Sequence, residues 1–288
     1  MDAATPRGPE ALGLDPETAM SIAELSEARA LWSTVALSPR GVRRAMGIQA
    51  ATFGSGIALA MQHDPTGGYW SRALAHGLTE PVDDALVGRL VDFFRGAEVP
   101  AAAIQIPDVL LPGDWDEIAA RHHLRAGRTL VKLIRHRSTP VAEAPTELRV
   151  SGIDARDAPA WAEVLIRGFG MPTQEDLVAM LASIVGRDFY AYGAFDGDRL
   201  VAAANVFIGG DVAHMAGSAT LPDARRRGAQ GALLKARIEA ATDMGCTWIT
   251  AEAPAEGDGE GGESLRTMRR AGFVELYRRR NWVWRPSH

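Results

Sequence analysis

Two kinds of hydrophobic spacing alternate along the chain, one typical of strands and the other of helices. Around Asp196-Gly197-Asp198, two apolar runs flank a turn sequence, which predicts a β-hairpin. Further on, Leu234, Ile238 and Ala241 recur at the spacing of one helix face. In the second half, the predicted strands are 148–151, 189–195, 200–208, 212–220, 247–252 and 273–284, and the predicted helices are 155–167, 174–185, one after residue 228, and 264–270.

The first half repeats this plan more faintly. Its predicted helices are 17–34, 82–94 and 114–122, and its predicted strands are 48–52, 56–61, 69–78, 102–106 and 128–134. Between the halves, the segment Ser138–Glu147 contains Pro140 and Pro145 and little apolar content, which is typical of an exposed linker. The pattern therefore predicts two domains, residues 1–138 and 147–288, joined by a linker at 139–146.

Composition narrows the classes of function. The 288 residues carry 31 Lys and Arg against 36 Asp and Glu, a formal charge of −5, whereas a nucleic-acid-binding protein would carry a net basic face. The single cysteine, Cys246, excludes a disulfide within the chain and suits a reducing compartment. Residues 1–15 lack the apolar segment of a signal peptide, and no apolar run approaches the ~20 residues of a membrane span. We expect a cytoplasmic protein with neither nucleic acid nor membrane as its partner.

The segment Thr220–Leu234 carries the most chemical information. It combines a strand end, the three arginines Arg225–Arg227, Gly228 and the first turns of a helix. Cations are unfavourable at a helix N-terminus, because they face the positive end of the helix dipole. A bound anion would reverse this, since it accepts hydrogen bonds from free backbone N–H groups and from guanidinium groups. The segment predicts a phosphorylated ligand, and the alternative is a solvated turn.

The same segment resembles the acyl-CoA motif of the GCN5-related N-acetyltransferase (GNAT) family, Gln/Arg-x-x-Gly-x-Gly/Ala. Arg225 and Gly228 match it, Thr220-Leu221-Pro222 resembles its usual strand end, and Gln230 stands where Gly or Ala is usual. The order of elements over residues 147–288 also resembles this family. The resemblance implies an α+β fold with α/β/α layers, in which a mixed, mostly antiparallel sheet is flanked by helices. It also implies transfer of an acetyl group from acetyl-CoA to a primary amine of a small molecule or peptide, by direct attack and without a metal.

The first half lacks this motif at the matching place. Between strand and helix it carries Glu80, Asp83 and Asp84, which would complement the helix dipole themselves and repel a pyrophosphate. We interpret this half as a degenerate GNAT-like domain without the pyrophosphate loop, with an unrelated α/β domain as the alternative. The chain would then be a tandem GNAT protein.

The resemblance implies where acetyl-CoA binds. Its pantetheine arm would pair with the backbone of the strand before the loop, and its pyrophosphate would accept hydrogen bonds from backbone N–H groups at the helix start. The implied cofactor-binding residues are Ser218, Ala219, Thr220, Leu221, Arg225, Arg226, Arg227, Gly228, Ala229, Gln230, Gly231 and Ala232.

Two residues are candidates for the general base, each with a structural role as its alternative. Glu252 ends the strand beside the predicted cleft, and His214 has the same parity on its strand as Ser218 and Thr220. The family's usual tyrosine acid is replaced by Met268.

Tyr277, Ser264 or water would then protonate the leaving thiolate. The departures from the family pattern leave a non-catalytic CoA-binding or regulatory scaffold as the alternative function. The acceptor amine and the possibility of a homodimer stay open.

Three further groups suggest no chemistry. His122-His123 lacks metal-ligand spacing. Arg278–Arg280 is predicted to lie on a solvated edge of the last strand. Trp282 and Trp284 are predicted to pack in the core.

Overall fold

A computed structural model describes residues 9–255 and 261–286. The start of the polar N-terminal segment (1–8) and part of the Gly/Glu-rich loop (256–260) lie outside the described residues. The strands are β1 (Ile48–Phe53), β2 (Gly56–Met61), β3 (Arg72–Leu74), β4 (Ala102–Pro107), β5 (Arg125–His136), β6 (Arg149–Gly152), β7 (Phe189–Asp196), β8 (Arg199–Gly209), β9 (Val212–Thr220), β10 (Trp248–Pro254) and β11 (Val274–Trp284). They form an 11-stranded sheet in the order β1-β2-β3-β4-β11-β5-β10-β9-β8-β7-β6.

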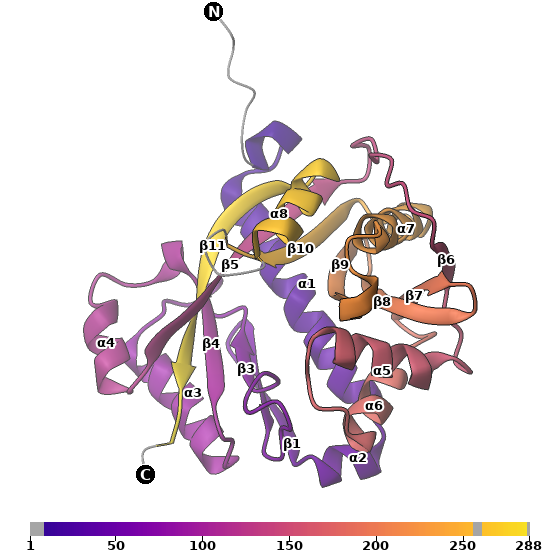
Figure 1. Cartoon of the computed structure of the whole chain (residues 1–288). Coiled ribbons are helices and arrows are strands. Elements are labelled where there is room, and N and C mark those ends of the chain that lie inside the picture. The colour runs from indigo at the N-terminus through magenta and orange to yellow at the C-terminus, as the bar shows by residue number, and fades with distance from the viewer. Residues whose placement is uncertain (1–8, 256–260, 287–288) are drawn as a thin grey trace, which may run out of the picture.

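Helices cover both faces of this sheet (Figure 1). They are α1 (Pro16–Leu37), α2 (Arg40–Ala45), α3 (Asp84–Gly96), α4 (Trp115–Arg121), α5 (Ala158–Gly168), α6 (Glu175–Ala182), α7 (Ala229–Asp243) and α8 (Gly261–Arg270). The helices α1, α2, α5 and α6 lie on one face, which we call face A, and the others lie on the opposite face B. The α/β/α layers predicted from the family resemblance are confirmed.

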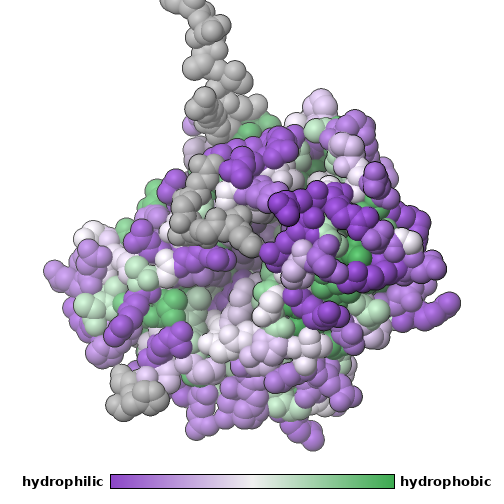
Figure 2. Space-filling model, viewed as in Figure 1, coloured by the Kyte–Doolittle hydropathy of each residue, from purple (hydrophilic) through white to green (hydrophobic). Residues whose placement is uncertain are grey.

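Successive residues of a strand point to opposite faces, and the core clusters follow this alternation. On face A, Ala203 and Phe207 of β8 pack with α5 and α6 around the fully buried Trp161. On face B, Val206 packs with Leu234 of α7. Face B also holds Trp282 and Trp284, which pack against Trp115 and Phe94, so their predicted core role is confirmed. Polar side chains cover much of the outer surface (Figure 2).

The two halves share strands at the centre of the sheet. Strand β11 of the second half lies between β4 and β5, and β5 of the first half lies between β11 and β10 (Figure 1). All of these pairings are antiparallel. The predicted solvated edge at Arg278–Arg280 is therefore wrong: β11 is an internal strand, and Arg279 is fully buried.

Two local elements differ from the prediction. The strand predicted at 69–78 shortens to β3, because Asp64 draws the preceding residues into a turn: its carboxylate accepts the N–H groups of Thr66, Gly68 and Trp70. The short helix α2, which follows α1 directly, was not predicted. No helix in residues 9–255 or 261–286 has the length and apolar character to span a membrane.

Candidate functional site

The sheet opens between its two central parallel strands of the second half. Strands β9 and β10 pair at three positions, from Val212 with Trp248 to His214 with Thr250, and then diverge. Beyond this point their facing edges are not paired with each other within the described strands. A cavity of about 540 Å³ occupies the opening and reaches both faces of the sheet. Its lining includes Gln230 of α7 on face B and Leu31 of α1 on face A.

A β-bulge lies beside this opening. Strand β8 places the single residue Asn205 opposite Ala216 and Gly217 of β9, so the register shifts by one residue. The bulge reverses the side-chain alternation along β9. His214 points toward face A and hydrogen-bonds Thr250, while after the bulge Ala219 faces α5 on that side. The predicted common parity of His214 with Ser218 is therefore wrong, because sequence alternation assumes an unbroken strand.

Helix α7 begins next to the end of β9. Its N-cap is Gly228, in the left-handed conformation (φ 81°), and no side chain caps the helix start. A Cβ on Gly228 would lie 2.4 Å from the carbonyl oxygen of Pro145, so the linker packs directly against the loop. The backbone N–H groups at this helix start are available to an anion.

The three arginines of the loop differ in their partners. Arg227 forms two hydrogen bonds to Asp196, at 2.6 and 3.0 Å. Arg225 reaches the carbonyl oxygen of Gly168 at the end of α5. Arg226 is exposed, with a left-handed backbone (φ 62°). Two of the three guanidinium groups thus help to hold the loop in place.

A buried ionic cluster lies on face A at the edge of the cavity. Arg279 of β11 binds Glu24 and Glu27 of α1 and the carboxylate of Glu252 of β10, at 2.6–3.0 Å. Lys132 of β5 binds Glu27 at 2.6 Å. Arg279 and Lys132 hold the pKa of Glu27 well below its usual range, against the effect of burial. The cluster joins α1 and β5 of the first half to β10 and β11 of the second.

Glu252 is the member of this cluster that both lines the cavity and retains some exposure, 23% of its side chain. It follows Thr250, the last residue of β10 that pairs with β9, by two positions, so it lies where these two strands separate. A carboxylate at this point can accept a proton from a group in the cavity.

His214 also lines the cavity but is buried. Its Nδ1 atom lies 3.0 Å from the Thr250 hydroxyl, which also contacts Ser26 of α1. Burial, aided by the positive charge of Lys132, lowers the pKa of His214 to about 3. The imidazole is therefore neutral at pH 7, and its conjugate acid is too strong to retain a proton taken from an amine.

Comparisons with known proteins identify the second half. Residues 159–257 match the family model described as Acetyltransferase (GNAT) family. This part of the chain belongs to the GNAT acetyltransferase family. No curated protein sequence matches the chain at a significant level.

Solved structures extend the likeness to the whole chain. A GCN5-related N-acetyltransferase from Kribbella flavida superposes with a TM-score of 0.61 at 19% identity, covering 93% of this chain and 96% of that one. One from Sphaerobacter thermophilus gives 0.59 at 15% identity, covering 81% and 78%. A tandem GNAT protein from the clavulanic acid biosynthesis pathway gives 0.54 at 15% identity, covering 95% and 97%. The chain has the fold of a tandem GNAT protein.

The donor side of this GNAT fold suits acetyl-CoA. The uncapped start of α7 can bind a pyrophosphate, and the open edge of β9 can pair with amides. Of the predicted cofactor-binding residues, Ser218 and Gln230 line the cavity. The hydroxyl of Thr220 is buried without a partner among the described residues. Leu221 has both backbone groups engaged, its N–H with Val201 and its carbonyl with Ala224.

The remaining predicted catalytic residue lies apart from the cavity. Tyr277 donates a hydrogen bond to Glu24 at 2.7 Å, and burial raises its pKa well above 10. It is not among the residues that line the cavity, whereas Ser264, Thr267 and Met268 of α8 are. Met268 thus stands beside the cavity, where sequence reasoning placed the missing tyrosine.

The sequence analysis missed the contribution of the first half. Its residues Gly67–Trp70, Arg72 and Gln105 line the face A side of the cavity. The turn sequence Asp64-Pro65-Thr66-Gly67-Gly68 signals a loop, but nothing in it indicates that β11 and β5 bring this loop beside the second half.

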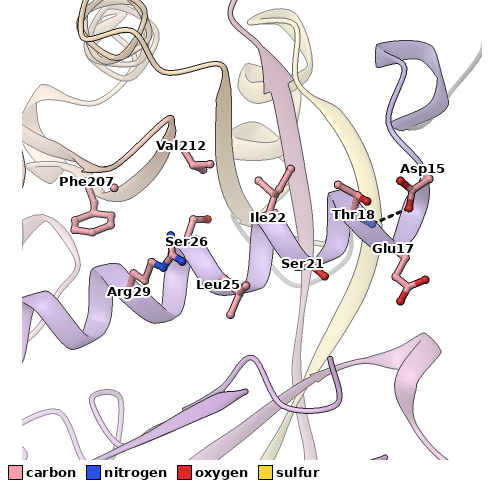
Figure 3. A pocket seen from close by; sticks show the side chains of 11 residues that line it. Asp15, Glu17, Thr18, Ser21, Ile22, Leu25, Ser26, Arg29, Phe207 and Val212 are labelled. Carbon is pink, nitrogen blue, oxygen red and sulfur yellow. Dashed lines mark hydrogen bonds between the residues drawn. The ribbon is translucent and has the colours of Figure 1, made fainter. Parts of the chain in front are cut away.

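A smaller pocket of about 380 Å³ lies along the N-terminal part of α1 (Figure 3). Ser21, Ile22, Leu25 and Arg29 of α1 line it together with Phe207 of the β8–β9 hairpin. None of the predicted site residues is part of its lining.

Proposed function

We propose that this chain transfers an acetyl group from acetyl-CoA to a primary amine of a small molecule or peptide. One observation carries the proposal: a single cavity extends from the start of α7 on face B, through the opening between β9 and β10, to the Glu252 carboxylate on face A. A donor and an acceptor that enter from opposite faces would meet at the opening. Membership of residues 159–257 in an acetyltransferase family supports this reading.

The donor would lie on face B. Acetyl-CoA supplies an acetyl group activated as a thioester. The N–H groups of residues 226–231 and the side chain of Gln230 would hold its pyrophosphate, and the open edge of β9 around Ser218 would hold its pantetheine amides. The N–H of Ala232, also predicted to bind the cofactor, instead donates to the carbonyl oxygen of Gly228. A backbone N–H near the bulge would stabilise the negative charge that develops on the acyl oxygen.

Glu252 would accept the proton of the attacking amine, directly or through a water molecule. Its contact with Arg279, at 2.7 Å, holds the carboxylate at the opening, within reach of an amine in the cavity. His214 is the weaker candidate because of its low pKa. On the other side of the opening, Ser264, Thr267 or water would protonate the departing thiolate, since no tyrosine of α8 can do so.

The test is acetyl-CoA-dependent release of free thiol over a panel of primary amines, with calorimetric binding of CoA measured in parallel. We expect turnover with at least one amine, and its loss in Glu252→Gln while CoA affinity stays unchanged. Met268 at the position of the usual acid favours a second candidate, a CoA-binding scaffold. Tight CoA binding without thiol release from any amine would support the scaffold and reject acetyl transfer.

A further inference from the structure

The acceptor side of the cavity is built largely by the first half of the chain. Its lining there comes from the loop that precedes β3, from β3 and β4, and from the rim formed by β5 and β11. The polar and aromatic residues concerned are Tyr69, Trp70, Arg72, Gln105, Arg128, Asn281 and Arg285. The degenerate half therefore contributes groups that a ligand on face A would contact.

The loop that carries Tyr69 and Trp70 is held in a fixed shape. One carboxylate oxygen of Asp64 accepts the N–H and hydroxyl of Thr66, and the other accepts the N–H groups of Gly68 and Trp70, at 2.5–3.1 Å. Asp64 itself is 9% exposed. Gly68 has a φ of 118°, and a Cβ there would lie 2.7 Å from the side chain of Ala101. The loop is thus preorganised, which reduces the entropy lost when a ligand binds.

Two polar atoms on this side lack partners among the residues that the structure describes. Gln105 is 1% exposed and donates a hydrogen bond to Asn281 at 2.6 Å, yet its carbonyl oxygen accepts none. The indole N–H of Trp70 is also buried without an acceptor. Buried polar groups are normally paired, so these two point to a polar ligand in the cavity.

Arg72 is the least exposed of the three arginines Arg72, Arg128 and Arg285 on this side, and the ion pair that it forms is long. Its guanidinium lies 4.1 Å from the ring centre of Tyr69, and its Nε donates to the carbonyl oxygen of the same residue. The nearest carboxylate, that of Glu27, is 4.0 Å away and already binds Lys132 and Arg279 at 2.6 Å. Over residues 9–255 and 261–286, no hydrogen-bond acceptor is assigned to its terminal nitrogens. A planar guanidinium in this state matches a carboxylate.

The charges around the acceptor side agree with this. Arg72, Arg128 and Arg285 line it, against Glu27 and Glu252, in a chain whose formal charge is −5. Arg279 contacts both glutamates, and Glu27 in turn contacts Arg72. This short series of contacts places Arg72 only a few side-chain groups from Glu252. An acceptor that reaches both residues would carry its amine and its anionic group a few bonds apart.

We propose that the first half selects the acceptor, and that the acceptor is an amine bearing a carboxylate, such as a free amino acid. Arg72 binds the carboxylate, the Trp70 indole N–H and the Gln105 carbonyl oxygen complete the polar contacts, and the amine lies at Glu252. This inference rests on the proposed acetyl transfer for its reaction, but its binding statement can be tested without turnover.

The experiment compares free amino acids with their carboxamides as acceptors for the wild type and Arg72→Gln. For each protein, the preference is kcat/KM for the amino acid divided by kcat/KM for its carboxamide. We compare the preference of the wild type with that of Arg72→Gln, because the difference in amine pKa between acid and amide cancels in the ratio of the two. We expect Arg72→Gln to lower kcat/KM for the amino acid about 10–100-fold and to change that for the carboxamide less than about twofold. Arg72→Lys, which keeps the charge but not the planar fork, should retain part of the preference.

Arg149→Gln is the matched control, since Arg149 also stacks on a ring, that of Phe195 at 4.2 Å, but does not line the cavity. Unchanged acetyl-CoA affinity and thermal midpoint would show that each variant folds. Equal losses for both acceptors in Arg72→Gln, or a wild type without preference, would overturn the inference.

If no amine is turned over, calorimetric binding of the same pairs to the CoA-saturated protein replaces kcat/KM. A preference for the carboxylate that depends on Arg72 would then support the proposed selectivity, while the proposal of acetyl transfer would be rejected. Equal binding of acid and amide overturns the selectivity.

Discussion

The two halves begin their matching helices in opposite ways. Helix α7 starts at Gly228 with no side-chain cap, beside three arginines. Helix α3 starts at Asp83, whose carboxylate accepts the N–H of Leu86 at 2.7 Å. The next residue, Asp84, binds Arg121, the last residue of α4, and His122, which follows it. In the first half, a carboxylate of the chain thus occupies the place that an anionic ligand could take in the second.

The comparison suggests how one fold can serve two roles. A helix start that satisfies its own N–H groups gains stability but cannot bind a phosphate, whereas an uncapped start gives up that stability. The first half, with its start closed, instead presents the loop before β3 and Arg72 to the shared cavity. One half keeps the donor site, and the other is free to shape the acceptor site.

The most severe test of this comparison separates the halves. Residues 1–138 alone lack β11, and residues 147–288 alone lack β5, so each loses an internal strand and leaves a buried edge unpaired. We expect neither half to show a cooperative thermal transition, and the two halves to co-purify when they are expressed together. Cooperative unfolding and CoA binding by 147–288 alone would show that the halves are independent domains.

The next largest effect is expected at Glu252. The change Glu252→Gln keeps the shape but removes the base, so turnover should fall about 10²–10⁴-fold while CoA affinity stays constant. Glu24→Gln is the control, because Glu24 binds the same Arg279 but does not line the cavity. Glu24→Gln should lower the thermal midpoint but reduce turnover far less than Glu252→Gln does. Full turnover in Glu252→Gln over the pH range would make Glu252 structural.

Most of the local structure could be predicted from the sequence. The hairpin at Asp196-Gly197-Asp198, the strand before the arginine loop and the helix after it follow from local patterns, and the structure has all of them. Glu252 does lie beside the opening, although β10 continues past it to Pro254 instead of ending there as predicted. Local spacing is enough where a motif and its elements are contiguous.

Three features could not be predicted, for physical reasons. The position of β11 between β4 and β5 depends on pairing between residues more than a hundred positions apart. The sequence analysis therefore predicted this last strand as an edge strand. The bulge at Ala216 and Gly217 is set by its partner strand, and it moved Ser218 away from the face of His214. The burial of Arg279 depends on its ion pairs with carboxylates of α1, which the residue spacing in β11 does not indicate.

A change at Gln230 sharpens the comparison of the two helix starts. Gln230 is exposed at the start of α7 and lines the cavity, so Gln230→Glu places there the kind of charge that the first half carries at Asp83. We expect CoA affinity to fall about 100-fold by calorimetry, because the carboxylate repels a pyrophosphate. Gln230→Ala should change it only slightly.

Gly228→Glu is a poorer probe of the same helix start, because φ at Gly228 is 81° and Pro145 blocks a Cβ there. The wild type should bind one CoA per chain. A second equivalent, or an unchanged affinity in Gln230→Glu, would contradict the assignment of the two helix starts.

The smallest expected effect compares one buried histidine from each half. Burial lowers the pKa of His214 to about 3 and that of His76 to about 4. In the unfolded chain both titrate near 6.5, so below that pH the unfolded state binds more protons than the folded state. The free energy of unfolding should therefore fall as the pH drops through this window, by about 2 kcal/mol per histidine between pH 7.5 and pH 5.

Urea unfolding of His214→Gln and His76→Gln at these two pH values measures each share. Above pH 5 the paired Glu27 adds little to the slope, because its pKa is lowered and its unfolded counterpart titrates near 4.5. Each variant should lose about half of the wild-type pH dependence, although each also changes the absolute stability. If the halves unfold as one unit, both histidines contribute to the pH dependence of a single unfolding transition. Two transitions, one sensitive to His76 and the other to His214, would show instead that the shared strands do not couple the halves.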